Sequence, residues 1–192
     1  TVHDLALRSL GTGTGLEALV AATPREAALD YEAVLAAGRV LPPLDHPEPA
    51  RFLITGTGLT HTGSATARNR MHMDTHGPDA IESDSMKIYR MGLDGGKPAE
   101  GEIGIQPEWF FKGVGTCVVP PGAPLDLPGF ALAGAEEAEI VGLYIVDAAG
   151  QPRRIGFTLG NDFSDHITEG KNYLYLAHSK LRDCSLGPEL LL

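Results

Sequence analysis

Residues 137–162 read EAEIVGLYIVDAAGQPRRIGFTLGND, and this stretch predicts two strands joined by a turn. Polarity alternates along the first strand, so that alternate side chains share a face. One face carries Glu137, Glu139, Val141, Leu143 and Ile145, and the other carries Ile140, Tyr144 and Val146. Residues 147–150, DAAG, are typical of a turn, and residues 154–160 predict a returning antiparallel strand. The hairpin should therefore bring Asp162 back to the level of Glu137.

Three carboxylates, those of Glu137, Glu139 and Asp162, are thus expected at one end of the hairpin. Carboxylates that close repel one another unless a cation lies between them. A set of oxygen ligands suits Mg²⁺, Mn²⁺ or Ca²⁺ better than zinc. We therefore predict a metal site with these three residues as ligands. On the pattern alone, the alternative is that Glu137 and Glu139 form the solvated edge of an exposed strand.

The carboxylates belong to a longer motif. Glu137-Ala138-Glu139 is followed by residues 156–164, GFTLGNDFS, and then by Lys180 shortly before Gly187-Pro188. In order and spacing this resembles the metal motif of the fumarylacetoacetate hydrolase superfamily: Glu-x-Glu, then G-[YF]-T-x-x-N-D-x-[ST], then a lysine ahead of a G-P or S-P turn. The resemblance covers residues 50–192. Residues 109–112 and 173–180 resemble one branch, the 2-keto-3-deoxy-L-arabinonate dehydratase-like proteins of arabinose catabolism.

The resemblance implies an α+β fold, a mostly β, mixed-sheet roll or barrel of the superfamily's C-terminal type with helices outside. Residues 50–192 would form this catalytic domain, and residues 1–49 a small helical N-terminal part and linker. Members of the branch begin earlier and continue past Gly187-Pro188, and this chain ends on three leucines. We therefore expect a fragment of a longer protein that lacks the C-terminal part of the domain. Members also commonly form homodimers.

The resemblance also suggests substrate-binding residues. Phe110-x-Lys112 is similar to the family's F-x-K-P, in which the lysine reaches toward the metal-bound substrate; the alternative is a surface lysine at a strand end. His166 stands where the family often has an arginine that holds an anionic substrate. Ser64 stands at the family's usual histidine position in the active-site wall. Because the water-activating histidine of the hydrolases is missing there, His61 is the candidate substitute; the alternative is an ordinary turn histidine.

The implied function is that of a metal-dependent dehydratase, which removes water from a sugar-derived acid such as 2-keto-3-deoxy-L-arabinonate. A divalent cation on the 2-oxo group would acidify the C3 proton, and the resulting enolate would expel the C4 hydroxyl. Lys180 is the candidate general base or proton donor, with a structural ion pair to Asp183 or Glu169 as the alternative. Two other functions remain open: hydrolysis of a C–C bond in acylpyruvates or fumarylacetoacetate, and binding of a metal or sugar acid without catalysis.

Charge and composition exclude some classes of binding partner. The 192 residues carry a formal net charge of -10, and without a basic cluster nucleic-acid binding is not expected. No apolar run approaches the roughly 20 residues that a membrane span needs, so a soluble cytoplasmic protein is expected. Cys117 and Cys184 form no zinc or redox motif, and we expect them to be buried, reduced thiols. Exposed apolar segments such as 143–146 or 109–111 could form a dimer contact.

The remaining elements follow from local patterns. Helices are expected over 2–8 and 16–21, and a capping box at Thr23 should start a third that ends at Gly38. Strands are expected over 51–55, 107–112 and, at an edge, 125–128, and helices over 64–74 and 85–91. Ser164 should cap a helix to Ser179 with a break near Gly170. His72 and His76 have the spacing of zinc ligands, but a solvent-facing lid helix is the stronger interpretation.

Overall fold

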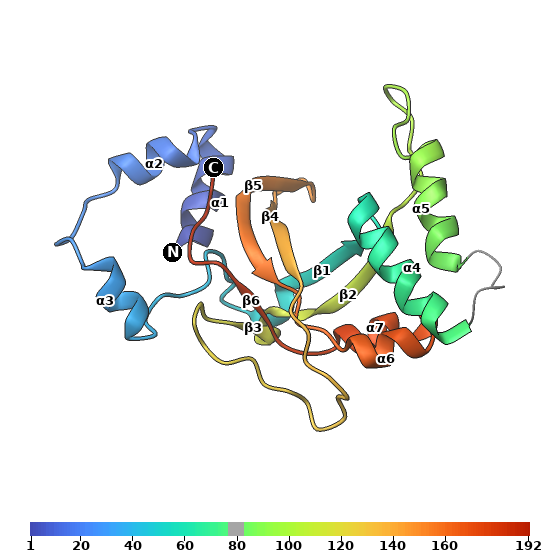
Figure 1. Ribbon diagram of the computed structural model, residues 1–192. Coiled ribbons are helices and arrows are strands. Elements are labelled where there is room, and N and C mark those ends of the chain that lie inside the picture. Colours follow the sequence, from blue (N-terminus) through green and yellow to red (C-terminus); the bar gives the residue numbers. More distant parts are fainter. Residues whose placement is uncertain (77–82) are drawn as a thin grey trace.

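A hairpin of two long antiparallel strands, β4 (Ala138–Val146) and β5 (Pro152–Asn161), lies near the centre of the molecule (Figure 1). The computed structural model describes residues 1–76 and 83–192, and only the backbone of residues 72–76. The other elements, in chain order, are α1 (Val2–Thr12), α2 (Leu16–Ala22), α3 (Tyr31–Ala36), η1 (Pro49–Arg51), β1 (Leu53–Gly58), α4 (Thr62–His76), α5 (Asp84–Gly95), β2 (Glu108–Val114), η2 (Gly115–Cys117), β3 (Val118–Val119), α6 (His166–Lys171), η3 (Tyr173–Tyr175), α7 (Leu176–Lys180) and β6 (Cys184–Leu186).

The strands form two sheets. β4 and β5 pair from Ala138↔Asn161 to Val146↔Pro152, with a bulge after Leu143. β6 joins β5 in antiparallel orientation and β3 joins β6 in parallel, which gives the order β3-β6-β5-β4. β1 and β2 form a separate antiparallel pair. The predicted hairpin and the α+β class with a mixed sheet are therefore confirmed.

The hairpin buries one face, as its alternation predicts. Leu143 and Ile145 are buried and join a core cluster with Ala6, Leu44 and Leu186. The other face carries Ile140, Tyr144 and Val146, all exposed. Figure 1 shows α1, α2 and α3 on one side of the hairpin and α4 to α7 on the other. Packing of α1 through Ala6 therefore joins the N-terminal helices to the central sheet.

The N-terminal helices differ from the expectation at two points. Helix α1 continues to Thr12, beyond the expected residues 2–8. Helix α3 begins at Tyr31, where Asp30 accepts the N–H of Ala33, and not at the capping box of Thr23. The Thr23 hydroxyl instead donates to the carbonyl of Leu19 at the end of α2, at 2.8 Å. A threonine between two helices can cap either the end of the first or the start of the second, and here it caps the end of the first.

Three other predictions about secondary structure were wrong. Strand β1 runs over residues 53–58 and not 51–55, and it is at most half-buried because it pairs on one side only. Residues 125–128 form no strand, since neighbouring prolines remove backbone donors. Asp165, not Ser164, caps α6 by accepting the N–H of Thr168. The predicted break near Gly170 is confirmed: the helix ends at Lys171, and the Asn172 side chain caps η3.

The helices expected over 64–74 and 85–91 are confirmed as α4 and α5. The proposed zinc pair His72 and His76 lies outside the residues whose side chains the structure describes. Among the described residues, no helix is both long enough and apolar enough to cross a membrane.

Candidate active site

The open end of the β4–β5 hairpin brings the predicted carboxylates together. The N–H of Asp162 donates to the carbonyl of Glu137 at 2.9 Å, and the N–H of Glu137 donates to the side-chain oxygen of Asn161 at 3.1 Å. Glu139 pairs with Gly160 across the hairpin. Burial raises the pKa of Glu139, and the charges of Glu137 and Asp162 raise it further. The three carboxylates therefore share one electrostatic environment.

Lys180 lies between two of these carboxylates. Its Nζ is 2.6 Å from Glu137 Oε1 and 3.1 Å from Asp162 Oδ2, and it donates to Ser164 Oγ at 3.0 Å. The ammonium also lies 5.1 Å from the centre of the Phe110 ring. Burial by itself lowers the pKa of Lys180, but the charges of Asp162 and Glu137 outweigh it and raise the pKa above its ordinary value. Lys180 is therefore a buried cation in this arrangement.

Lys112 approaches Asp162 from the opposite side. Its Nζ lies 2.6 Å from Asp162 Oδ1 and donates to the carbonyls of Phe163 and Lys180 at 2.7 and 3.1 Å. Asp162 Oδ1 is buried and has this ion pair but no hydrogen bond. Lys112 itself is buried, which excludes the alternative of a surface lysine. Two ammonium groups thus hold one carboxylate.

His166 contacts Glu137 at the exposed edge of the cluster. Its Nε2 lies 3.0 Å from Glu137 Oε1, and this hydrogen bond raises the pKa of His166 against the opposing effect of burial. Burial alone would raise the pKa of Glu137, but the hydrogen bond from His166 and the charge of Lys180 bring it down to about 2. Glu137 is therefore ionised at neutral pH. Of the three basic residues of the cluster, Lys112, Lys180 and His166, His166 is the most exposed.

His61 and Ser64 lie at the start of α4. The N–H of Ser64 donates to His61 Nδ1 at 3.1 Å, and the Ser64 hydroxyl donates to the His61 carbonyl at 3.0 Å. His61 Nδ1 therefore accepts a backbone N–H at the start of α4, which is the structural role that the alternative of a turn histidine implies. The catalytic role of His61 and the substrate-binding role of Ser64 stay predictions.

A buried ion network next to Lys180 was not predicted from the sequence. Arg68 of α4 places Nε 2.6 Å from Glu169 Oε1 and NH1 3.1 Å from Glu108 Oε1. The other oxygen of Glu169 lies 3.2 Å from the Ser179 hydroxyl oxygen and 3.9 Å from Lys180 Nζ. The sequence pointed to Glu169 only as the alternative ion-pair partner of Lys180. Arg68 and Glu108 carried none, because their elements are far apart in the chain.

The donor groups fit a hard divalent cation. The predicted ligands Glu137, Glu139 and Asp162 offer only oxygens, and Asp162 Oδ1 is a buried acceptor without a hydrogen bond. The group of described residues whose ligand atoms lie within 4.8 Å of one another is Glu137, His166 and Glu169, and not the predicted set of Glu137, Glu139 and Asp162. Both oxygens of Glu169 already contact Arg68 and Ser179, however. Glu137 is common to both sets.

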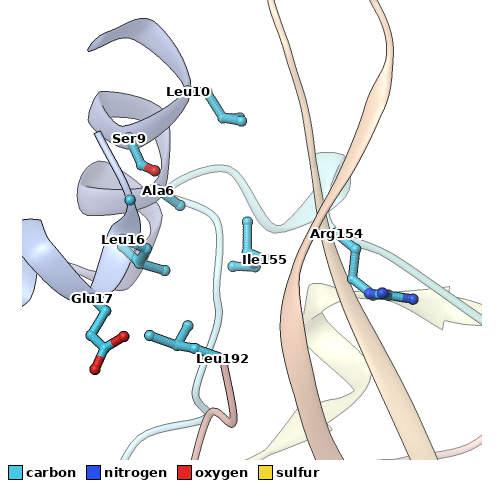
Figure 2. A pocket seen from close by; sticks show the side chains of 9 residues that line it. Ala6, Ser9, Leu10, Leu16, Glu17, Arg154, Ile155 and Leu192 are labelled. Atoms are coloured by element: carbon cyan, nitrogen blue, oxygen red, sulfur yellow. The ribbon is translucent and has the colours of Figure 1, made fainter. Parts of the chain in front are cut away.

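The cavity shown in Figure 2 lies apart from this cluster. It has a volume of about 350 Å³ and is lined by residues of α1 and α2, by Arg154 and Ile155 of β5, and by Leu192. None of the carboxylates, lysines or histidines of the site lines it. The site is thus an ion cluster at the hairpin end, next to α6 and α7, and this cavity has no part in its chemistry.

Comparison with known proteins agrees with the branch that the motif resembles. No protein-family profile matches the chain. A probable 2-keto-3-deoxyxylonate dehydratase of Haloferax volcanii is 39% identical over 85 residues, which are 43% of this chain and 28% of that protein. Solved structures of 2-keto-3-deoxy-D-arabinonate dehydratase in the apo form and of 2-keto-3-deoxyarabinonate dehydratase in a hexagonal crystal form superpose with TM-scores of 0.58 and 0.62, at 20% and 22% identity.

A third structure, 2-keto-3-deoxy-D-arabinonate dehydratase complexed with magnesium and 2,5-dioxopentanoate, superposes with a TM-score of 0.55 at 19% identity. Each structural match covers 88% of this chain and 50 to 52% of the solved chain. The chain therefore has the fold of about half the length of each of these solved dehydratase chains. The predicted resemblance to 2-keto-3-deoxy acid dehydratases is confirmed.

Proposed function

We propose that this chain carries the metal-binding and proton-transfer residues of a dehydratase that acts on a 2-keto-3-deoxy sugar acid. The observation that carries the proposal is the pair of buried lysines on either side of Asp162, at the hairpin end where Glu137 and Glu139 also lie. An ion pair with a purely structural role consists of one cation and one anion. Two ammonium groups and three carboxylates gathered at one end of a hairpin instead form a site that can hold an anionic, metal-chelating substrate.

In this proposal Glu137, Glu139 and Asp162 hold Mg²⁺, with Mn²⁺ or Ca²⁺ as alternatives. The cation would supply Lewis-acid polarisation of the 2-oxo group of the substrate. Asp162 is fixed for this role by Lys112 and Lys180, which neutralise its charge without supplying a hydrogen bond to Oδ1. Magnesium in the related structure supports the choice of metal.

Lys180 is the proposed proton donor to the departing C4 hydroxyl. Because the carboxylates around it raise its pKa, Lys180 Nζ carries a proton at neutral pH, which a leaving hydroxide requires. Loss of that proton would leave a neutral amine next to two carboxylates, so Lys180 would quickly regain it. His166 and Lys112 are the proposed partners of the substrate carboxylate, since both can present positive charge beside the carboxylates.

The substrate is proposed to be a 2-keto-3-deoxy-pentonate such as the L-arabinonate form. The related proteins are named for the D-arabinonate and xylonate forms. C–C bond hydrolysis is less well supported, because His61 Nδ1 is taken up by the N–H of Ser64 and Ser64 replaces the usual histidine. The roll or barrel closure, the division at residue 50, the cytoplasmic location and the homodimer are part of the same proposal.

The experiment is calorimetric titration of Mg²⁺ into the full-length natural protein, with and without pyruvate as a minimal 2-keto acid. We expect wild-type protein to bind Mg²⁺ more tightly with pyruvate, and Asp162→Asn to lose the binding. Asp147→Asn is the matched control, because Asp147 lies in the turn at the other end of the hairpin and pairs with Arg153. Equal Mg²⁺ binding by the wild type and Asp162→Asn would overturn the ligand assignment.

Turnover is then measured with the L-arabinonate, D-arabinonate and D-xylonate forms of the 2-keto-3-deoxy acid. A dehydratase gives one product that retains every carbon of the substrate. A hydrolase of C–C bonds gives two shorter acids, and that product pattern would replace the dehydratase proposal. Absence of turnover with intact metal binding would favour the non-catalytic binding protein.

A further inference from the structure

The two cysteines of the chain lie together although they are far apart in the sequence. Cys117 ends η2, directly before β3, and Cys184 begins β6. The parallel pairing of these strands places Val118 opposite Cys184. Each thiol shifts the pKa of the other, as neighbouring thiols do. Two cysteines at the paired ends of neighbouring strands are placed to form a covalent bond, a possibility that their sequence spacing did not indicate.

The two sulfurs differ in their surroundings. Cys117 is half-buried and Cys184 is buried. The neighbouring Cys184 thiol lowers the pKa of the Cys117 thiol, and the charge of Lys112 adds to this against the effect of burial. The neighbouring Cys117 thiol and burial raise the pKa of Cys184. The more accessible sulfur is therefore also the better nucleophile.

We propose that Cys117 and Cys184 form a reversible intramolecular disulfide when the protein is exposed to a peroxide. The Cys117 thiolate attacks one peroxide oxygen, the O–O bond breaks, and hydroxide leaves and takes up a proton to become water. This oxidises Cys117 to a sulfenic acid. The Cys184 sulfur then attacks the Cys117 sulfur, the S–O bond breaks, and the sulfenic oxygen leaves with the Cys184 proton as a second water. Two electrons pass from the sulfurs to the peroxide.

The disulfide would connect the segments that carry the two lysines of the site. A Cβ at Gly113 would lie 2.9 Å from Cys117 Sγ, so the sulfur packs directly on the residue after Lys112. Cys184 lies four residues after Lys180 on the short segment that leads to β6. A disulfide needs the sulfurs about 2.05 Å apart, closer than two thiols in contact. Its formation should shift both lysines relative to Asp162. This consequence rests on the proposed function, whereas formation of the bond does not.

The test exposes the full-length protein to hydrogen peroxide, followed by free-thiol titration and mass spectrometry of unreduced peptides. We expect the thiols of Cys117 and Cys184 to be lost in the wild-type protein, with one peptide pair, lighter by two hydrogen atoms, joined through these residues and both thiols restored by dithiothreitol. Cys184→Ser should stop at a sulfenic acid on Cys117 that dimedone traps. Cys117→Ser should keep its remaining thiol over the same exposure, because Cys184 is buried.

An internal control sets the peroxide dose. Met91 is 52% exposed, and its oxidation marks non-specific damage. The disulfide should form at doses that leave Met91 intact. Joining of two chains, oxidation of Met91 before any thiol loss, or retention of both thiols would each overturn the proposal. Magnesium titration of reduced and oxidised protein then measures the effect on the site, and failure of the reduced protein to bind Mg²⁺ would count against the proposed function alone.

Discussion

Removal of the Arg68 charge should destabilise the protein strongly. The Arg68 side chain is 11% exposed, and its guanidinium serves Glu108 and Glu169, which are 1% and 3% exposed. Arg68→Met keeps most of the apolar stem and leaves two carboxylates buried without their cation. Breaking a buried pair by removing one partner costs about 3–5 kcal/mol. Because one guanidinium serves two carboxylates here, we expect a loss of about 5 kcal/mol in the free energy of unfolding.

The assay is equilibrium unfolding in urea at pH 7, with Arg153→Met as the matched control. Arg153 makes an equally short contact, 2.8 Å to Asp147, but the two side chains are 56% and 16% exposed. An exposed pair contributes about 0–1 kcal/mol, so the control should hardly change the unfolding midpoint. Arg68→Lys should fall between the two, because an ammonium cannot contact both carboxylates as the planar guanidinium does. Equal losses for Arg68→Met and Arg153→Met would refute the argument from burial.

Three further predictions concern single positions. Backbone N–H groups hold the pKa of Asp165 at about 2 against the opposing effect of burial, below the ordinary value of 3.8. Its contribution of about 1–2 kcal/mol should therefore be complete above pH 4 and lost as the pH falls through 2. Asp165→Asn should show a flatter dependence of the urea midpoint on pH in that range, and an unchanged slope would contradict this. Gly56→Ala should cost about 1–3 kcal/mol, because the new methyl group meets the Phe110 ring across the β1–β2 pair. Gly92→Ala, on the open surface of α5, should instead stabilise the protein by about 0.5–1 kcal/mol, and thermal melts of the two variants give their order. The reverse order would be evidence against the packing described. Lys180→Met should abolish turnover yet tighten Mg²⁺ binding about tenfold, or 1.4 kcal/mol, since the carboxylates lose their competing cation. Weaker Mg²⁺ binding by this variant would mean that the ammonium is needed to hold the ligands in place.

The hairpin and the centre of the site could be predicted because their signals are local. Alternation from Glu137 to Val146 fixed which side chains turn inward, and the length of the turn determined that Asp162 would return to Glu137. The position of Lys180 depends on the chain turning back over the hairpin end, which periodicity alone does not indicate. That part of the prediction came from the motif.

The remaining features could not be predicted because they depend on contacts between distant elements. Arg68 and Glu108 are ordinary charged residues in sequence, and only the packing of α4 against β2 and α6 buries them. The capping box at Thr23 failed for a different reason. The threonine could cap either the preceding or the following helix, and it bonds to the preceding one. The contact of Cys117 with Cys184 depends on the parallel pairing of β3 with β6, two strands too short to be recognised from sequence.

The position of β4 at the end of its sheet has a practical consequence for work with this chain. The strand leaves one row of backbone groups without a neighbouring strand in the described sheet, and its outer face presents Ile140, which is 78% exposed, beside Tyr144 and Val146. A long apolar edge of this kind is a template for strand addition between copies. Preparations of this segment should therefore aggregate as the concentration rises. A lysine in place of Ile140 would oppose aggregation without touching the carboxylates, because position 140 lies on the face opposite Glu139.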